Sequence, residues 1–223
     1  MSTEEQDSFY SNHYSLMMNT GVIYRFWGLI HHLMERPFKN ISEGRVLEIG
    51  AGNGEHIRAI SGKIASYYAT DIRVDSLKKN LSDFDNVIVE TQDVMNLSYD
   101  DNFFDRVIVT CVLVHLDNPV IALEEINRVV KPGGYISIYL PCEPGMVLRF
   151  IRKFSTQAKA SRIGVTDIKY LHFLEHKTYF LAVDYYLKRI FGAGKISSRY
   201  FPFPFLSWNF NLFKLYTIRK NNS

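Results

Sequence analysis

The stretch VLEIGAGNGEH, Val46–His56, most constrains the fold, because it places Gly50, Gly52 and Gly54 directly behind a short apolar run. Glycine in the turn after a strand permits a positive φ and lets a ligand approach the bare backbone. The pattern predicts a buried strand at 45–49, then a glycine turn that opens a helix over EHIRAISGKI. In α/β folds such a turn binds nucleotides at the carboxyl edge of the sheet.

The spacing of the glycines narrows the ligand class. The dinucleotide fingerprint requires G-x-G-x-x-G or G-x-G-x-x-A, whereas here Gly54 is followed by Glu55. A glutamate at this position would repel a pyrophosphate, and the Lys-Ser/Thr pair of a triphosphate-binding loop is missing. We therefore expect a ligand with an adenosine-like body and no phosphates.

Apolar and amphipathic segments alternate between residues 44 and 142, which predicts a parallel sheet covered by helices on both faces. The chain should close with an antiparallel pair of strands over KISSRYFPF and LFKLYTIRK, at a sheet edge where prolines are tolerated. Helices are expected within 9–37 and 145–191. The expected organisation is a helical N-terminal cap (1–43), a ligand-binding core (44–142) and a C-terminal region (143–223) that completes the sheet. The strands of the core are expected at 45–49, 66–72, 86–93, 103–114 and 135–141, and its further helices at 73–81 and 118–130.

Two carboxylates fall where an adenosine-like ligand would need them, and a third lies inside a strand. Asp71 ends the second strand, 21 positions after Gly50, where an acid can accept hydrogen bonds from the two ribose hydroxyls. Asp93 ends the third strand and can accept from the exocyclic amine of a base, with Val94 covering the ring. Glu48 lies inside an apolar strand, and because a buried acid is costly unless paired, we expect it to meet a cation or backbone amides.

Composition excludes several protein classes. Hydrophobic residues make up 47 % of the chain and charged residues 22 %, as in a globular protein. Cys111 and Cys142 cannot supply a disulfide framework, and the acidic start MSTEEQDSF is unlike a secretory signal. The apolar runs are too short to span a bilayer. We therefore expect a cytoplasmic protein, with contact to the inner face of the membrane as the open alternative.

Five motifs in order, VLEIGAGNGEH, ATDI, TQDV, FFDRVIVTCVLVHL and RVVKPGGYISI, resemble the core of class I S-adenosylmethionine-dependent methyltransferases of the small-molecule type. The resemblance covers about residues 44–142. It implies a Rossmann-like, mostly parallel seven-stranded sheet, S-adenosylmethionine as cofactor and S-adenosylhomocysteine as product. It further implies that the methionine half of the cofactor contacts Glu48, Gly50, Ala51, Gly52 and Gly54. Asp71 and Ile72 would hold the ribose, and Asp93 and Val94 would hold the adenine. Thr110 and Cys111 would lie under the sulfonium.

Two clusters could act on the methyl acceptor. His115 follows the fourth strand at the active-site edge, where it could be a general base or a histidine that only shapes the loop. The motif LHFLEH brings His172, Glu175 and His176 within one helical turn of one another. Its H-x-x-E-H spacing is a zinc-protease signature in inverted order, but the sequence supplies no third ligand, so a metal is not expected. These side chains would instead line the acceptor pocket or form a solvated helix face.

The C-terminal region bears on the acceptor. Residues 143–223 hold 14 Lys or Arg against 4 Asp or Glu, and 17 of the 32 aromatic residues. The basic segment VLRFIRKFSTQAKASR (147–162) could lie on an anionic membrane or pack on the core with a solvated face. PGMVLRFIRKFSTQAKA, FLEH and RYFPFPF resemble the substrate region of bacterial methyltransferases associated with O-antigen and capsule synthesis.

From these observations we expect an S-adenosylmethionine-dependent methyltransferase that O-methylates a sugar hydroxyl of a nucleotide- or lipid-linked glycan in surface polysaccharide biosynthesis. The alternative acceptor is another small amphipathic molecule, such as a quinone, a phospholipid amine or a natural product. A cofactor-binding protein without turnover remains open. The Asn/Asp-Pro-Pro-Tyr block that positions an amino group in adenine and cytosine methyltransferases is missing after the fourth strand, which argues against that substrate class. An RNA-directed enzyme that uses the basic face is a less favoured alternative, and nucleic acid is not an expected partner.

Overall fold

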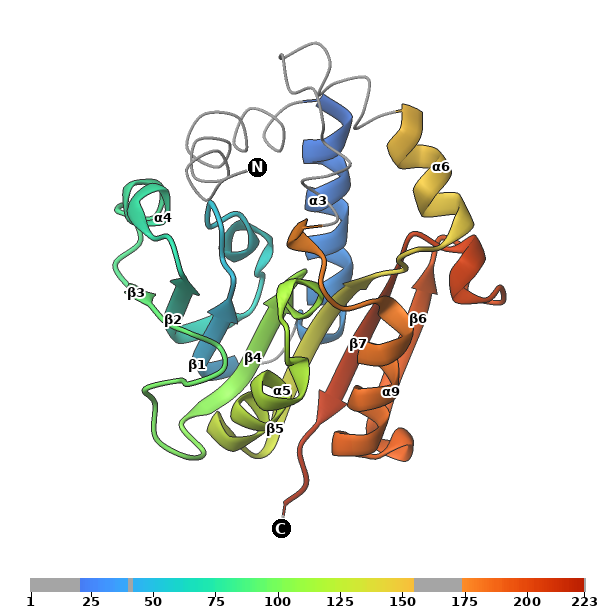
Figure 1. Cartoon of the computed structure of the whole chain (residues 1–223). Helices are drawn as coiled ribbons and strands as arrows, with labels where there is room; N and C mark the ends of the chain where they lie inside the picture. The colour runs from blue at the N-terminus through green and yellow to red at the C-terminus, as the bar shows by residue number, and fades with distance from the viewer. Residues whose placement is uncertain (1–20, 40–41, 155–173, 223) are drawn as a thin grey trace.

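The computed structural model describes residues 21–39, 42–154 and 174–222. Seven strands form one sheet in the order β3-β2-β1-β4-β5-β7-β6, in which β7 and β6 are antiparallel to their neighbours and the other strands run parallel (Figure 1). The predicted α/β class and the antiparallel edge are therefore confirmed. The strands are β1 (Ser42–Ile49), β2 (Lys63–Asp71), β3 (Val87–Thr91), β4 (Phe104–Thr110), β5 (Val130–Pro141), β6 (Ile196–Phe201) and β7 (Phe213–Arg219).

Helices cover both faces of the sheet, and each face buries an apolar cluster (Figure 1). On one face α5 (Pro119–Val129) and α9 (Phe180–Phe191) contribute fully buried residues such as Leu123 and Leu187. On the other face α3 (Gly21–Glu35) and α4 (Asp75–Asn80) contribute Ile30 and Leu77. A further helix, α6 (Met146–Phe154), follows β5 and lies at the carboxyl edge of the parallel strands.

The prediction of a helix directly after the glycine turn is wrong. Only a single 3₁₀ turn, His56–Ala59, forms there, and β2 already begins at Lys63. The reason is tertiary, because the His56 side chain is fully buried and bonded to Glu35 of α3. This anchor holds the segment against the N-terminal helix.

The fourth strand is shorter than the predicted range 103–114. It ends at Thr110, and Cys111 adopts a left-handed φ of 61°, which turns the chain into the 3₁₀ helix Leu113–His115. The reversal keeps the residues after β4 at the carboxyl edge of the sheet. Ligands of open α/β sheets bind at this edge, where the strand order switches between β1 and β4.

Within the part of the chain that the structure describes, no helix is both long and apolar enough to cross a bilayer. His172 and the basic residues Lys159 and Arg162 of the 147–162 segment lie outside the described residues.

Candidate active site

The glycine turn has the conformation that its sequence predicts. Gly50, Gly52 and Gly54 have φ values of 72°, 56° and 76°, which side-chain-bearing residues rarely adopt. A Cβ on Gly50 would come 2.2 Å from Val112 Cγ2, so the turn is packed against the loop that follows β4. A Cβ on Gly52 would meet no atom of the described residues within 4 Å. The backbone at Gly52 therefore borders open space, as a cradle for a ligand requires.

Asp71 lies beside this cradle. Its Oδ2 accepts a hydrogen bond from the backbone N–H of Gly52 at 2.9 Å, and its Oδ1 accepts from the N–H of Arg73 at 3.1 Å. The carboxylate thus links the end of β2 to the glycine turn, and its remaining lone pairs can accept from hydroxyl groups. The adjoining Ile72 is 69 % exposed, which is unusual for a large apolar side chain and leaves it open to a ligand.

Asp93 and Val94 follow β3, at the same edge. Asp93 Oδ1 accepts from the N–H of Met95 at 2.9 Å, which orders this turn. Val94 is buried in the core cluster beside α5. The adenine contacts implied by the family resemblance stay predictions for this pair.

Among the described residues, Glu48 is bonded to a phenol hydroxyl and not to the cation or backbone amides that we expected. Its Oε2 accepts a hydrogen bond from the hydroxyl of Tyr67 at 2.7 Å, and its side chain is fully buried. Burial raises the pKa of this carboxyl, although the nearby His56 and the Tyr67 hydrogen bond oppose the shift. Glu48 therefore lies in a buried polar layer beneath the glycine turn, and a direct contact with the cofactor stays a prediction.

A buried ion-pair network ties the N-terminal helix to this layer, and the sequence reasoning missed it. Glu35, at the end of α3, contacts Arg106 of β4 through both oxygens, at 3.0 and 2.6 Å. The same carboxylate lies 2.8 Å from Nε2 of His56. Burial alone would raise the pKa of Glu35, but the hydrogen bonds and charges of these two partners lower it to about 2. The network thus fixes the start of the segment that follows the glycine turn.

Thr110 ends β4, and Cys111 follows it in the loop next to the glycine turn. The hydroxyl of Thr110 is buried, and no hydrogen-bond partner for it is found in the described part of the chain. Such an orphaned polar atom at the ligand edge fits a site that a polar ligand completes. Burial raises the pKa of the Cys111 thiol to about 12, with the carboxylate of Glu143 adding to the shift, so Cys111 is a neutral thiol and not a nucleophile at pH 7.

The two predicted catalytic clusters come together. His115 lies at the end of the 3₁₀ helix after β4, and its Nδ1 is 3.0 Å from the backbone carbonyl of Glu175. The ring centroids of His115 and His176 lie 4.6 Å apart in an edge-to-face arrangement. Backbone N–H groups of Lys177 and Thr178 donate to the carbonyl of Val114, at 2.9 and 3.1 Å, and clamp the two segments. His172 lies outside the described residues.

Glu143 is the member of this cluster that sequence reasoning missed. Its Oε2 lies 2.6 Å from Nδ1 of His176, and its carboxylate also pairs with the guanidinium of Arg152 on α6. The side chain is nearly fully buried. An acid directly after an apolar strand was a usable signal, because the third strand led to the assignment of Asp93 in the same way. The segment after β5, helix α6 and the segment around His176 therefore meet at the carboxylate of Glu143.

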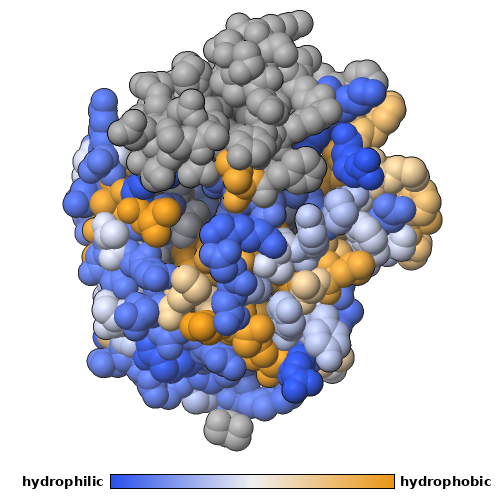
Figure 2. All heavy atoms as spheres, viewed as in Figure 1, coloured by the Kyte–Doolittle hydropathy of each residue, from blue (hydrophilic) through white to orange (hydrophobic). Residues whose placement is uncertain are grey.

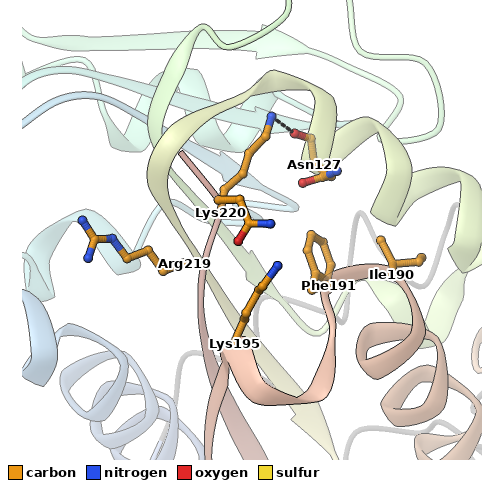
Figure 3. Close-up of a pocket in the computed structure, with 7 residues that line it drawn as sticks. Asn127, Ile190, Phe191, Lys195, Arg219 and Lys220 are labelled. Atoms are coloured by element: carbon orange, nitrogen blue, oxygen red, sulfur yellow. Dashed lines mark hydrogen bonds between the residues drawn. The ribbon is translucent and has the colours of Figure 1, made fainter. Parts of the chain in front are cut away.

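A separate pocket lies at the other end of the sheet (Figure 3). The Nζ of Lys220 donates to the backbone carbonyls of Asn127 and Val130, at 2.6 and 2.7 Å. The N–H of Gly133, near the start of β5, donates to the carbonyl of Lys220. This pocket is therefore at the amino edge of the parallel strands, opposite the glycine turn, and it is not the candidate site. Its lining residues are Asn127, Ile190, Phe191, Lys195, Arg219, Lys220 and Asn221.

Comparison with known proteins identifies the domain. Residues 47–138 match the family model described as a methyltransferase domain. This chain carries a class I S-adenosylmethionine-dependent methyltransferase domain. Its fold is that of solved methyltransferases at low sequence identity. The N-methyltransferase NodS from Bradyrhizobium japonicum, in complex with S-adenosylhomocysteine, superposes with a TM-score of 0.65 at 13 % identity, and 97 % of each chain is covered. A possible histamine N-methyltransferase from Thermotoga maritima superposes with a TM-score of 0.66 at 17 % identity, and 96 % of this chain and 98 % of that chain are covered.

Curated relatives of this methyltransferase domain are named for quinone biosynthesis. The ubiquinone/menaquinone biosynthesis C-methyltransferase of Coxiella burnetii is 31 % identical over 103 residues, which are 42 % of this chain and 41 % of the relative. The demethylmenaquinone methyltransferase of Staphylococcus haemolyticus is 26 % identical over 171 residues, which are 70 % of this chain and 71 % of the relative. The chain thus spans about two fifths of the length of the Coxiella protein that it matches.

Proposed function

We propose that this protein transfers the methyl group of S-adenosylmethionine to a small amphipathic acceptor of the quinone type, with His115, His176 and Glu143 at the acceptor side of the cofactor. The observation that carries the proposal is that the ring of His176 packs against the ring of His115, which lies on the loop after β4. Val112 of that loop contacts the glycine turn, so the imidazoles and the cofactor cradle share one short segment.

The residues present fit the cofactor. Gly52 offers open backbone, Asp71 offers carboxylate oxygens, Ile72 offers an exposed apolar side chain, and the Thr110 hydroxyl lacks a partner among the described residues. When bound, S-adenosylmethionine supplies an electrophilic methyl group on a positively charged sulfur. The protein must hold the nucleophile in line with that methyl group and exclude water, and orientation of this kind contributes about 7–11 kcal/mol.

The acceptor side requires a proton acceptor, which the histidines supply. On a hydroquinone-type acceptor, an imidazole removes the proton of a ring hydroxyl and so raises the electron density at the adjoining ring carbon. Transfer of the methyl group from sulfur to that carbon would leave S-adenosylhomocysteine. The ring carbon would then release its proton to solvent, and the imidazolium would return its proton to the ring oxygen, which restores the aromatic hydroquinone. A positioned base adds about 10²–10⁴-fold. Glu143 holds the ring of His176 in one orientation through Nδ1, at 2.6 Å.

The comparisons support a quinone-type acceptor over the sugar hydroxyl that we expected from the C-terminal region. Both curated relatives described above are named for quinone methylation, and the similarity to the Staphylococcus haemolyticus protein extends over 70 % of this chain. The proposal therefore adopts the alternative acceptor class. The site residues assigned from the sequence belong to the same proposal, except His172, which lies outside the described residues.

The direct test is a single-turnover assay with S-adenosylmethionine that carries a labelled methyl group. The purified chain is offered a demethylated hydroquinone in detergent, a nucleotide-linked sugar, or neither. Label in the hydroquinone supports the proposal, and the loss of a ring proton in the product identifies C-methylation. Label in the sugar alone would overturn the acceptor assignment, and cofactor binding without label in either acceptor would overturn it as well.

A further inference from the structure

The loop between β6 and β7, residues 202–212, exposes large apolar side chains. Phe203, Phe205, Leu206 and Phe210 are between 41 % and 97 % exposed, with Phe205 at the upper limit. The loop contains no charged residue. Soluble proteins rarely gather exposed apolar side chains in this way unless the surface has a partner.

The apolar loop is held in one conformation by a fully buried asparagine. The Asn211 Oδ1 accepts from the N–H of Phe203 at 2.8 Å, and its Nδ2 lies 3.0–3.1 Å from the carbonyls of Phe203, Leu206 and Ser207. A single side chain thus satisfies four backbone groups of the loop. Because the loop is ordered from within, its phenylalanines are presented in a fixed geometry rather than exposed by fraying.

Helix α6 extends this surface and adds positive charge. The N–H of Met146, its first residue, donates to Asn209 Oδ1 of the loop at 2.8 Å. Met146, Phe150 and Ile151 are exposed, and so are Arg149 and Lys153 on the same helix. Neither 144–154 nor 196–215 contains an acidic residue. In Figure 2, hydrophobic spheres gather at the upper right-hand edge, over α6 and the 202–212 loop, with hydrophilic spheres beside them.

This surface adjoins the candidate active site. Arg152 of α6 pairs with Glu143, and Trp208 of the loop stacks on Phe180 with ring centroids 6.0 Å apart. Phe180 in turn donates its N–H to the carbonyl of Glu143. The apolar surface and the Glu143–His176 pair are therefore connected through α6 and the start of α9.

We propose that the surface formed by the 202–212 loop and α6 docks on an anionic membrane, with Phe205 and its apolar neighbours entering the headgroup region and Arg149 and Lys153 meeting lipid phosphates. Apolar side chains beside basic ones are the combination that binds anionic lipid surfaces, because burial of apolar area and charge attraction add. The docked orientation places the acceptor side of the site next to the bilayer. The surface itself is defined without reference to the acceptor, so docking can be tested separately from the methylation reaction.

The test is sedimentation of the full chain with two sets of vesicles, phosphatidylcholine alone and phosphatidylcholine mixed with phosphatidylglycerol. We expect binding to the mixed vesicles that weakens with salt. The double change Phe205→Ser with Leu206→Ser, and the double change Arg149→Glu with Lys153→Glu, should each lower the partition coefficient about tenfold or more. Matched controls are Ile121→Ser, an exposed apolar residue of α5, and Lys78→Glu with Lys79→Glu on α4, which should bind as the unchanged chain does.

Thermal unfolding of each variant verifies that it is folded before binding is compared. Equal binding to both vesicle types, or binding that the controls reduce as much as the test variants do, would overturn the proposal. So would a concentration-dependent dimer that the Phe205 and Leu206 changes abolish while vesicle binding stays absent, because the occupant would then be a second copy of the chain. Methyl transfer to a water-soluble acceptor should persist in the test variants, which separates failure of docking from failure of the proposed reaction.

Discussion

The Nδ1 atom of His176 lies 2.6 Å from Oε2 of Glu143, and the ring of His176 meets that of His115 edge to face. A carboxylate in this position orients the imidazole and stabilises its protonated form when it takes up a proton. The pair joins a segment after β5 to one 33 residues later, so it exists only in the folded chain. It is the arrangement on which the proposed proton transfer depends.

Removing this carboxylate charge should impair turnover more than binding. We expect Glu143→Gln to lower kcat about 10–100-fold, since a positioned base contributes about 10²–10⁴-fold and the imidazole is retained. The affinity for the cofactor, measured by calorimetry, should change little. The double variant Glu143→Gln with His176→Gln should be no slower than His176→Gln alone, because the two residues act as one unit. Additive losses, or an unchanged kcat, would contradict the pair's role.

Asp71 should be needed for cofactor affinity. We expect Asp71→Ala to weaken binding of S-adenosylhomocysteine about 10–100-fold, because it removes charge-assisted acceptors, each of which contributes about 1.5–3 kcal/mol. Calorimetry gives the affinity and thermal unfolding verifies the fold. Asp75→Ala, in the exposed first turn of α4, is the matched control. If both variants bind alike, the ribose assignment is wrong.

Alanine at the two glycines Gly50 and Gly52 should separate stability from binding. Both positions require a left-handed backbone, which costs a residue with a Cβ about 1–2 kcal/mol. Only at Gly50 would the Cβ also collide with Val112. We therefore expect Gly50→Ala to lower the unfolding free energy clearly more than Gly52→Ala. Gly52→Ala should instead lose cofactor affinity, because its methyl group would enter the open cradle.

The buried His31 on α3 should make stability depend on pH. Burial lowers its pKa to about 3 from 6.5, assisted by His56, although Glu35 opposes the shift. The unfolded chain therefore takes up a proton at His31 that the folded chain refuses. The free energy of unfolding that the uncharged, buried His31 contributes is complete above pH 6.5 and is lost as the pH falls from 6.5 toward 3.

The check is urea denaturation of the unchanged chain and of His31→Gln between pH 7.5 and pH 4. The upper limit lies about one pH unit above the ordinary pKa of histidine, and the lower limit lies about one pH unit above the pKa of the buried His31. The unchanged chain should lose about 1.4 kcal/mol per pH unit more than the variant does in that window, before other groups titrate. His32→Gln changes the exposed neighbour on the same helix and serves as the control. Parallel pH curves for His31→Gln and the unchanged chain would exclude His31 as the titrating group.

Local sequence pattern determined the fold class, the antiparallel edge and the conformation of the glycine turn. Alternating apolar runs specify strands, and glycine at 50, 52 and 54 specifies a backbone that other residues avoid. These are local properties, so they can be read from neighbouring residues. The location of His115 at the sheet edge followed from its place directly after an apolar strand.

Only the tertiary structure decided which distant side chains meet. It replaced the expected helix after the glycine turn with a 3₁₀ turn, because His56 bonds to Glu35, 21 positions away. It paired Glu48 with Tyr67 instead of a cation, and it joined Glu143 to His176. The physical reason is that a buried charge must be neutralised by whatever group the packing of helices and strands brings within hydrogen-bond distance, and that group is not specified by local pattern.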